Sequence, residues 1–312
     1  MTVGYDTLNI GLKRVHCQDT DLLRTVPKYL NSIICEGRNQ SGNFISGYLD
    51  SLKVNIYENG VYIKEGSLCK YHLGDSFKTL TRYDTREAIE RISDNLHLPI
   101  HLANVTRIDF AQNIVMEHPE NIYYSYLGEA PYYKRVMLNN GVYYKSGKRT
   151  NLFYGKVQEQ KLKKHPIPIY YKNKHVLRYE SRYTSQLPKQ FNLPEITAGL
   201  LYNEIFYWEL IKRWENEYLS IQKVKSKVNT MKATGSKKQF IEDLALFTIL
   251  EVGQAPILGK VKEWQATGGI TKKQAFELRQ YLKQVSNIPA KESSNEFINE
   301  LTRKIKEEAR YN

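Results

Sequence analysis

The first 160 residues alternate between apolar and polar positions with a period of two, the pattern of strands that are half buried in a sheet. Four segments show it most clearly: residues 5–12, 51–68, 105–116 and 149–157. Within the second segment, Glu58-Asn59-Gly60 predicts a hairpin turn, because Asn-Gly accepts the positive φ values that a tight turn requires.

Helical periodicity appears between these strands. Residues 19–35 and 84–96 carry apolar side chains three and four positions apart, and Asp84 is the predicted N-cap of the second helix. Strands interleaved with helices at these intervals predict an α+β or split βαβ layout.

After Pro194 the pattern becomes helical. Five segments are predicted helices: residues 195–220, 239–251, 257–266, 271–287 and 293–310. We therefore expect a first domain over residues 1–194 and an all-α domain over 195–312 that binds DNA or a partner. The stretch LGKVKEWQATGGITKKQAFELRQYLKQV has helix-turn-helix spacing, which small helical bundles share. The basic segment 223–238 suits either a DNA backbone or a solvated linker.

Charge and composition narrow the range of partners. The 312 residues include 46 Lys and Arg against 33 Asp and Glu, and a net charge of +13 favours a polyanion, most often nucleic acid. The 24 tyrosines among basic residues suit stacking on single-stranded bases. No apolar run is long enough for a membrane span, and three unpaired cysteines are typical of a cytoplasmic protein. Phosphate-loop, dinucleotide-binding and zinc motifs do not occur.

One predicted strand carries an unusual carboxylate. In VTRIDFAQNIV, Arg107, Asp109 and Asn113 share one face, whereas Ile108 and Phe110 point to the other. A carboxylate in mid-strand is costly to bury unless it pairs with a cation or binds a metal. A salt bridge to a neighbouring arginine would also explain it.

A second strand has the same character, because Arg178, Glu180 and Arg182 alternate along RYESR. If a three-residue loop connects this strand to IPIYYKN, the hydrophobic pattern predicts a hairpin that places Tyr170 and Lys172 beside the charged row. Tyr171 would then lie on the buried face.

This face has the groups that phosphodiester chemistry requires. Asp109 and Glu180 could hold a divalent cation, which would polarise the scissile phosphate. The cationic side chains expected to bind phosphate oxygens are Arg178, Arg182 and Lys172. Tyr170 is the candidate nucleophile, and a nearby cation would favour its phenolate form.

These motifs together resemble a known family. VTRIDFAQNIV, IPIYYKN and HVLRYESRYTSQLPKQFNLP resemble the R-I-D, Y-x-K and R-[FY]-E-x-R elements of the filamentous-phage gene-two endonucleases and of related phage and plasmid rolling-circle initiators. YIKEGSLCKYHLGDS resembles the G-S-L-x-K element of that family, and YDTLNI resembles its opening strand. The resemblance covers most of residues 5 to 200.

The resemblance implies an HUH-endonuclease-like antiparallel sheet and a nickase that forms a 5′-phosphotyrosine and a free 3′-OH with Mg2+ or Mn2+. It assigns the nucleophile to Tyr170 with Lys172 beside it, and two metal ligands to Asp109 and Glu180. Asn113 stands where plasmid relatives often have a second acid, so the third ligand stays open among Asn113, Asp6 and Glu65. Arg107 and Lys70 complete the expected phosphate-binding set. The histidine pair of the wider superfamily is not recognisable.

Alternatives remain. Tyr171, Tyr202 or Tyr207 could be the nucleophile, and the protein could be a transposase or relaxase of the same fold or a non-catalytic DNA binder. The expected partners are origin DNA, as duplex, hairpin or single strand, with a host helicase, polymerase and single-strand-binding protein. The expected location is the bacterial cytoplasm.

Overall fold

The computed structural model describes residues 3–17, 20–224, 236, 240–241, 244, 254–286 and 296–310. Two compact units are present: Met1–Lys223 with Phe297–Asn312, and Val224–Glu296. This division differs from the expected boundary at residue 194, because the first unit includes the following long helix and the last one.

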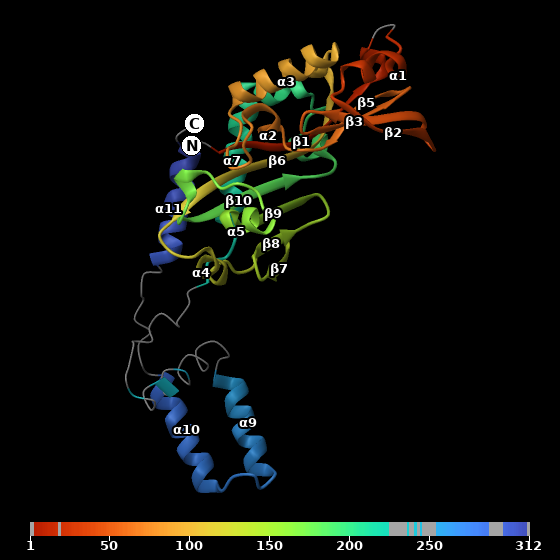
Figure 1. Ribbon diagram of the computed structural model, residues 1–312. Coiled ribbons are helices and arrows are strands. Elements are labelled where there is room, and N and C mark those ends of the chain that lie inside the picture. The colour runs from red at the N-terminus through yellow and green to blue at the C-terminus, as the bar shows by residue number, and fades with distance from the viewer. Residues whose placement is uncertain are drawn as a thin grey trace. The chain divides into compact units, whose positions relative to one another are not determined.

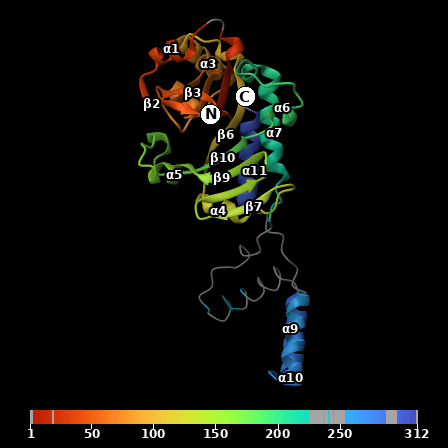
Figure 2. The same ribbon diagram turned by 90° about the vertical axis from the view of Figure 1, so that its right-hand side faces the viewer.

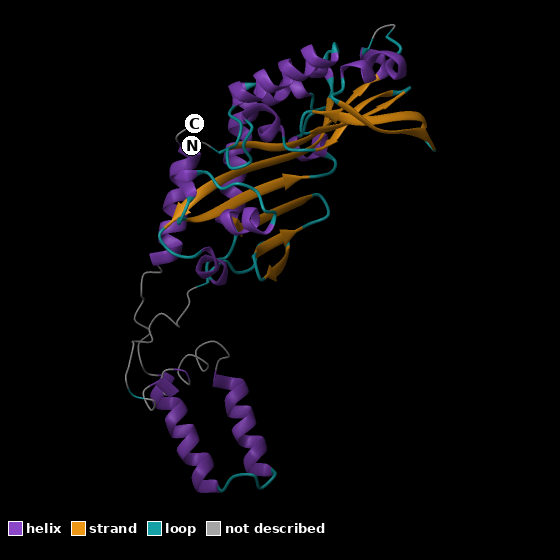
Figure 3. Cartoon of the chain, in the orientation of Figure 1, coloured by secondary structure: helices purple, strands orange, loops and turns teal. Residues whose placement is uncertain are grey.

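The first unit is built on a ten-stranded antiparallel sheet with strand order β2-β3-β4-β5-β1-β6-β10-β9-β8-β7 (Figures 1 and 3). Its strands are β1 (Gly4–Lys13), β2 (Ser32–Asn39), β3 (Gly42–Leu49), β4 (Leu52–Tyr57), β5 (Gly60–Glu65), β6 (Asn104–Met116), β7 (Lys134–Leu138), β8 (Gly141–Lys145), β9 (Arg149–Gly155) and β10 (His175–Tyr183). The α+β fold class is therefore confirmed.

Helices lie on both sides of this sheet (Figure 2). The helices of the first unit are α1 (Leu22–Thr25), α2 (Leu68–Leu73), α3 (Arg82–Leu96), α4 (Glu120–Ser125), α5 (Lys156–Leu162), α6 (Leu187–Phe191), α7 (Glu204–Ser220) and α11 (Glu296–Arg310). Helices α7 and α11 cover one side, and α5 lies on the other. None of the helices in the described part of the chain is long and apolar enough to cross a membrane.

Alternation along the central strands separates a core from a charged face. Ile108 and Phe110 of β6 and Tyr179 of β10 are buried in the core under α7, where the Tyr179 ring lies 4.6 Å from that of Trp214. Asp109 points to the opposite side of β6, which we call the charged face.

The strand predictions over the four alternating segments are confirmed, with β4 and β5 forming the expected hairpin. The helix predicted over residues 19–35 is wrong. Pro27 restricts the backbone there, so that only a short helix and a 3-10 turn form before β2, in which Ile33 and Ile34 are exposed. The N-cap of α3 is Thr81, and Asp84 completes its capping box.

The last helix belongs to the first unit. Leu301 and Ile305 of α11 are fully buried in its core, and the Lys304 ammonium donates to the carbonyl of Val115 at 2.7 Å. The Tyr123 hydroxyl of α4 bonds to Glu300. A chain that leaves this unit after α7 therefore returns to it at α11.

The second unit contains α9 (Gln254–Ala266) and α10 (Lys272–Ser286), as predicted. Gly268 between them has a φ of 76°, a value that favours glycine. The basic segment 223–238 and the helix predicted over residues 239–251 lie largely outside the described residues.

Candidate active site on the charged face

Strand register brings the two predicted charged rows together. β10 runs antiparallel to β6, with Arg178 opposite Asn113 and Arg182 opposite Asp109. Side chains opposite each other point to the same face of a sheet. Asp109 and Glu180 therefore lie side by side on the charged face, as the alternation predicts.

Arginines bind both carboxylates. Arg107 donates two hydrogen bonds to Asp109, at 2.7 and 2.5 Å. The Nε of Arg182 lies 2.6 Å from Glu180 Oε1 and 3.6 Å from Asp109 Oδ2, so one cationic group already stands between the two acids. Arg182 is one-third exposed, which leaves its guanidinium within reach of solvent and of a ligand.

Arg178 is different because its side chain is 0% exposed. Its guanidinium lies 2.9 Å from Asp6 of β1, without hydrogen-bond alignment, and 3.5 Å from Glu180. It also donates to Asn113 Oδ1 at 3.0 Å, and the other amide atom of Asn113 donates to the carbonyl of Phe77. Arg178 therefore balances buried charge and does not reach solvent, contrary to the expected phosphate contact. Asn113 is similarly occupied by protein partners.

The pKa values of the two carboxyls are shifted in opposite directions. Burial, together with the charge of Glu180, raises the pKa of Asp109 to about 7 in spite of its bonds to Arg107. For Glu180 burial is outweighed by Arg182 and Arg178, which lower its pKa to about 2. Asp109 is therefore the carboxyl of this pair that changes protonation near neutral pH.

A tyrosine outside the predicted set completes the group. Tyr154 of β9 lies opposite Arg178, and its hydroxyl donates to Glu180 Oε2 at 3.2 Å. Two residues later, Lys156 is buried on the same face, where it contacts Glu159 at 2.8 Å. Burial and the charge of Arg178 lower the pKa of Lys156. Tyr154-Gly155-Lys156 is thus a Y-x-K element that begins on a strand, and its spacing was visible in the sequence.

Tyr170 lies elsewhere than expected. The predicted hairpin is wrong: Ile169–Tyr171 form a 3-10 turn, and the exposed fraction is 91% for Ile169 and 57% for Tyr170. The Tyr170 ring contacts the Lys174 ammonium, 3.6 Å from its centroid. Tyr171 is the buried one, stacked on Phe77, and burial raises its pKa to about 12. The role of Tyr170 as nucleophile stays a prediction, and the tyrosine hydroxyl that contacts Glu180 on the charged face is that of Tyr154.

The remaining predicted site residues differ in whether they lie on the charged face. Asp6 belongs to the charged face, whereas Glu65 pairs with Lys53 at 3.0 Å. Lys70 and Lys172 are exposed. Tyr207 belongs to α7 and is buried on the core side of the sheet, where its hydroxyl donates to the carbonyl of Val3.

The donor set of the charged face fits a divalent cation in chemical type. Asp109 and Glu180 supply carboxylate oxygens, and both contact the single cationic Nε of Arg182. In the described part of the chain, no third His, Cys, Asp or Glu completes a set of three with them. Among the described residues, the group whose three potential ligand atoms lie within 4.8 Å of one another is His72, Asp84 and Glu87, on α2 and α3.

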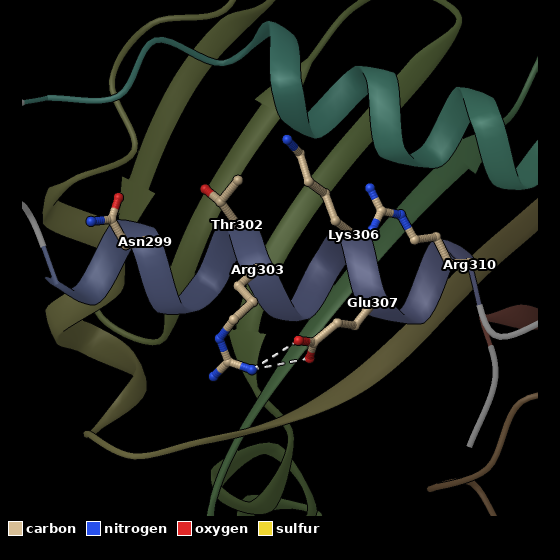
Figure 4. Close-up of a pocket in the computed structure, with 6 residues that line it drawn as sticks. All are labelled: Asn299, Thr302, Arg303, Lys306, Glu307 and Arg310. Atoms are coloured by element: carbon tan, nitrogen blue, oxygen red, sulfur yellow. Dashed lines mark hydrogen bonds and ion pairs between the residues drawn. The ribbon is translucent and has the colours of Figure 1, made fainter.

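The hollow in Figure 4 is not part of this site. Its lining consists of six residues of α11: Asn299, Thr302, Arg303, Lys306, Glu307 and Arg310. Because α11 packs on the core side of the sheet, this hollow is remote from the charged face in the fold.

Residues 44–217, more than half of the chain, match the family described as the N-terminal part of the phage gene-two replication-associated protein. The chain therefore belongs to this family of phage rolling-circle replication initiators. No curated protein matches the chain.

Proposed function

We propose that this replication initiator nicks one strand of origin DNA with Tyr154 as the nucleophile. The observation that carries the proposal is the hydrogen bond from the Tyr154 hydroxyl to Glu180, beside Arg178 and Asp109 on one face of the sheet. A simple DNA binder has little need for buried carboxylates next to a tyrosine, because carboxylates repel phosphates.

The reaction is a phosphoryl transfer from DNA to the protein. The Tyr154 oxygen forms a bond to phosphorus, and the bond from phosphorus to the 3′ oxygen breaks. The phenol loses one proton and the leaving oxygen gains one, which leaves a 5′-phosphotyrosine and a 3′-OH. The reverse attack by a 3′-OH religates the strand.

The side chains around Tyr154 have separate tasks. Burial and the charge of Glu180 raise the pKa of Tyr154, so this phenol is neutral in the resting protein. Asp109 and Glu180 would hold Mg2+ or Mn2+, which supplies the positive charge that favours phenolate and polarises the phosphate. Arg182 and Arg107 are partly exposed and can turn to phosphate oxygens. Lys156 adds a buried positive charge on the same face.

The test is a cleavage assay on supercoiled and single-stranded DNA that carries the element's own intergenic region, with Mn2+ or with EDTA. We expect a covalent adduct at a 5′ end that forms only with metal. Mass spectrometry of the digested adduct should place the DNA on the peptide that contains Tyr154.

Each alternative has its own outcome. An adduct on Tyr170 or Tyr171 would keep the nickase and move the nucleophile. A metal-independent adduct would overturn the cation site on Asp109 and Glu180. Tight DNA binding without any adduct would favour the non-catalytic binder. Transfer of a cut end to an unrelated target would favour a transposase or relaxase.

A further inference from the structure

An aromatic row lies on the same sheet face as the candidate active site. Phe44 of β3, Tyr57 of β4 and Tyr62 of β5 stand on adjacent strands, with neighbouring ring centroids 5.8 Å apart in both steps. Register places them together, because Phe44 is opposite Tyr57 and both strands are antiparallel. All three side chains are partly exposed.

Strand order connects this row to the charged face. β5 pairs with β1, where Tyr62 lies opposite Gly11, and β1 pairs with β6, where Thr7 lies opposite Asp109. Residues two apart on β1 share a face, so Gly11 and Thr7 point the same way. Adjacent strands are about 4.8 Å apart, which puts β5 roughly 10 Å from β6.

Glycines on the neighbouring strands leave room for two of the rings. A Cβ atom on Gly11 would come within 2.7 Å of the Tyr62 ring, and one on Gly37 within 3.2 Å of the Phe44 ring. The Tyr62 and Phe44 rings therefore cover neighbouring strands and present partly exposed aromatic surface. The plane of the Tyr57 ring makes an angle of 33° with that of Phe44 and 76° with that of Tyr62. Tyr57 stands between them.

Basic residues accompany the row. The Lys64 ammonium lies 5.2 Å from the centre of the Tyr62 ring, and Lys13 is exposed on the same face at the end of β1. Aromatic side chains interleaved with lysines on a sheet are the arrangement by which proteins hold single strands, with bases on the rings and phosphates on the cations.

We propose that Phe44, Tyr57 and Tyr62 form a stacking platform for single-stranded DNA that leads to the candidate active site. The inference rests on the proposed function, because it assigns the platform to nucleotides that flank the cleaved phosphate. Single-stranded DNA is favoured over a protein partner because the row is continuous with the charged face and carries lysines.

The experiment measures binding of the full chain to a fluorescent single-stranded oligonucleotide. Tyr57→Leu removes the central ring, and Phe44→Leu with Tyr57→Leu removes two, while Gly11 and Tyr62 stay unchanged. Loss of stacking should weaken binding about 5- to 150-fold per base. Tyr57→Phe, which keeps the ring, should bind like wild type. Tyr83→Leu is the matched control, because Tyr83 is an exposed tyrosine beside Arg82 on α3.

Photo-crosslinking of wild-type protein to oligonucleotides that contain 5-iododeoxyuridine gives a readout independent of folding. Crosslinks on Phe44, Tyr57 or Tyr62 support the platform. Crosslinks only elsewhere, with wild-type affinity in the double variant, overturn it. The experiments also test the stacking platform and the nickase activity separately. An adduct without these crosslinks leaves the nickase intact, and these crosslinks without any adduct leave the platform intact.

Discussion

The hydroxyl of Tyr154 on β9 donates a hydrogen bond to Glu180 on the neighbouring strand β10, with 3.2 Å between the oxygens. This contact joins the one titratable hydroxyl of the Y-x-K element to a carboxylate that two arginines hold ionised. It is the basis for assigning nucleophile and cation site to adjacent strands.

Replacing Tyr154 with phenylalanine should abolish covalent adduct formation, with at least a thousand-fold loss of cleavage, because no other group supplies the attacking oxygen. Stability should change by only about 1 kcal/mol, because the ring keeps its packing. Adduct yield and urea unfolding measure the two effects. Tyr170→Phe is the control and should cleave like wild type, and the opposite ranking of the two variants would contradict the assignment.

Glu180 should make the fold sensitive to acid. Its pKa is below the ordinary value of about 4.3, so the native state binds fewer protons than the unfolded chain. The stabilisation is therefore complete above that ordinary value and lost as the pH falls towards 2. Urea unfolding at pH 5 and pH 3 should show a smaller pH dependence for Glu180→Gln than for wild type. If the unfolding free energies of the two proteins depended equally on pH, the ion pairs of Glu180 with Arg182 and Arg178 would be refuted.

Asp109 should have the opposite effect on how folding stability depends on pH. Its pKa of about 7 is above the ordinary value of about 3.9, so between these values the native state binds more protons. Stability should fall as the pH rises through this window, and Asp109→Asn should remove that part of the decline. Unfolding free energies at pH 5 and pH 8 test this, and an unchanged difference in the variant would argue against a buried, protonated Asp109.

Arg178 is expected to be essential to the fold. Arg178→Met leaves Asp6 and Glu180 without their buried partner and should lower the free energy of unfolding by about 3–5 kcal/mol. Chemical denaturation measures the loss. The control is Arg86→Met, which breaks an exposed pair with Glu90 on α3 and should cost less than about 0.5 kcal/mol. Comparable losses in both variants would show that burial of Arg178 does not matter.

The last helix should stabilise the first unit. Leu301→Ala on α11 removes a fully buried side chain and should cost about 2–5 kcal/mol in unfolding free energy. Glu307→Ala, on the exposed side of the same helix, is the control and should cost well under about 1 kcal/mol. If Leu301→Ala unfolds like wild type, α11 is not part of the core.

Much of the fold could be predicted because strand alternation is local. Ile108 and Phe110 must face a core, so Asp109 must face away from it, whatever the rest of the chain does. The same argument holds for Arg178 and Glu180 on β10. The sequence by itself therefore determined the α+β class, the charged face and the acids on it.

Only the tertiary structure decided which tyrosine joins those acids. Tyr154 and Tyr170 both precede a lysine by two residues, and the local pattern does not separate them. The choice depends on the register between β9 and β10 and on the 3-10 turn at Ile169–Tyr171, both of which are set by contacts between distant segments. The return of α11 arises in the same way, since it joins residues far apart in the chain.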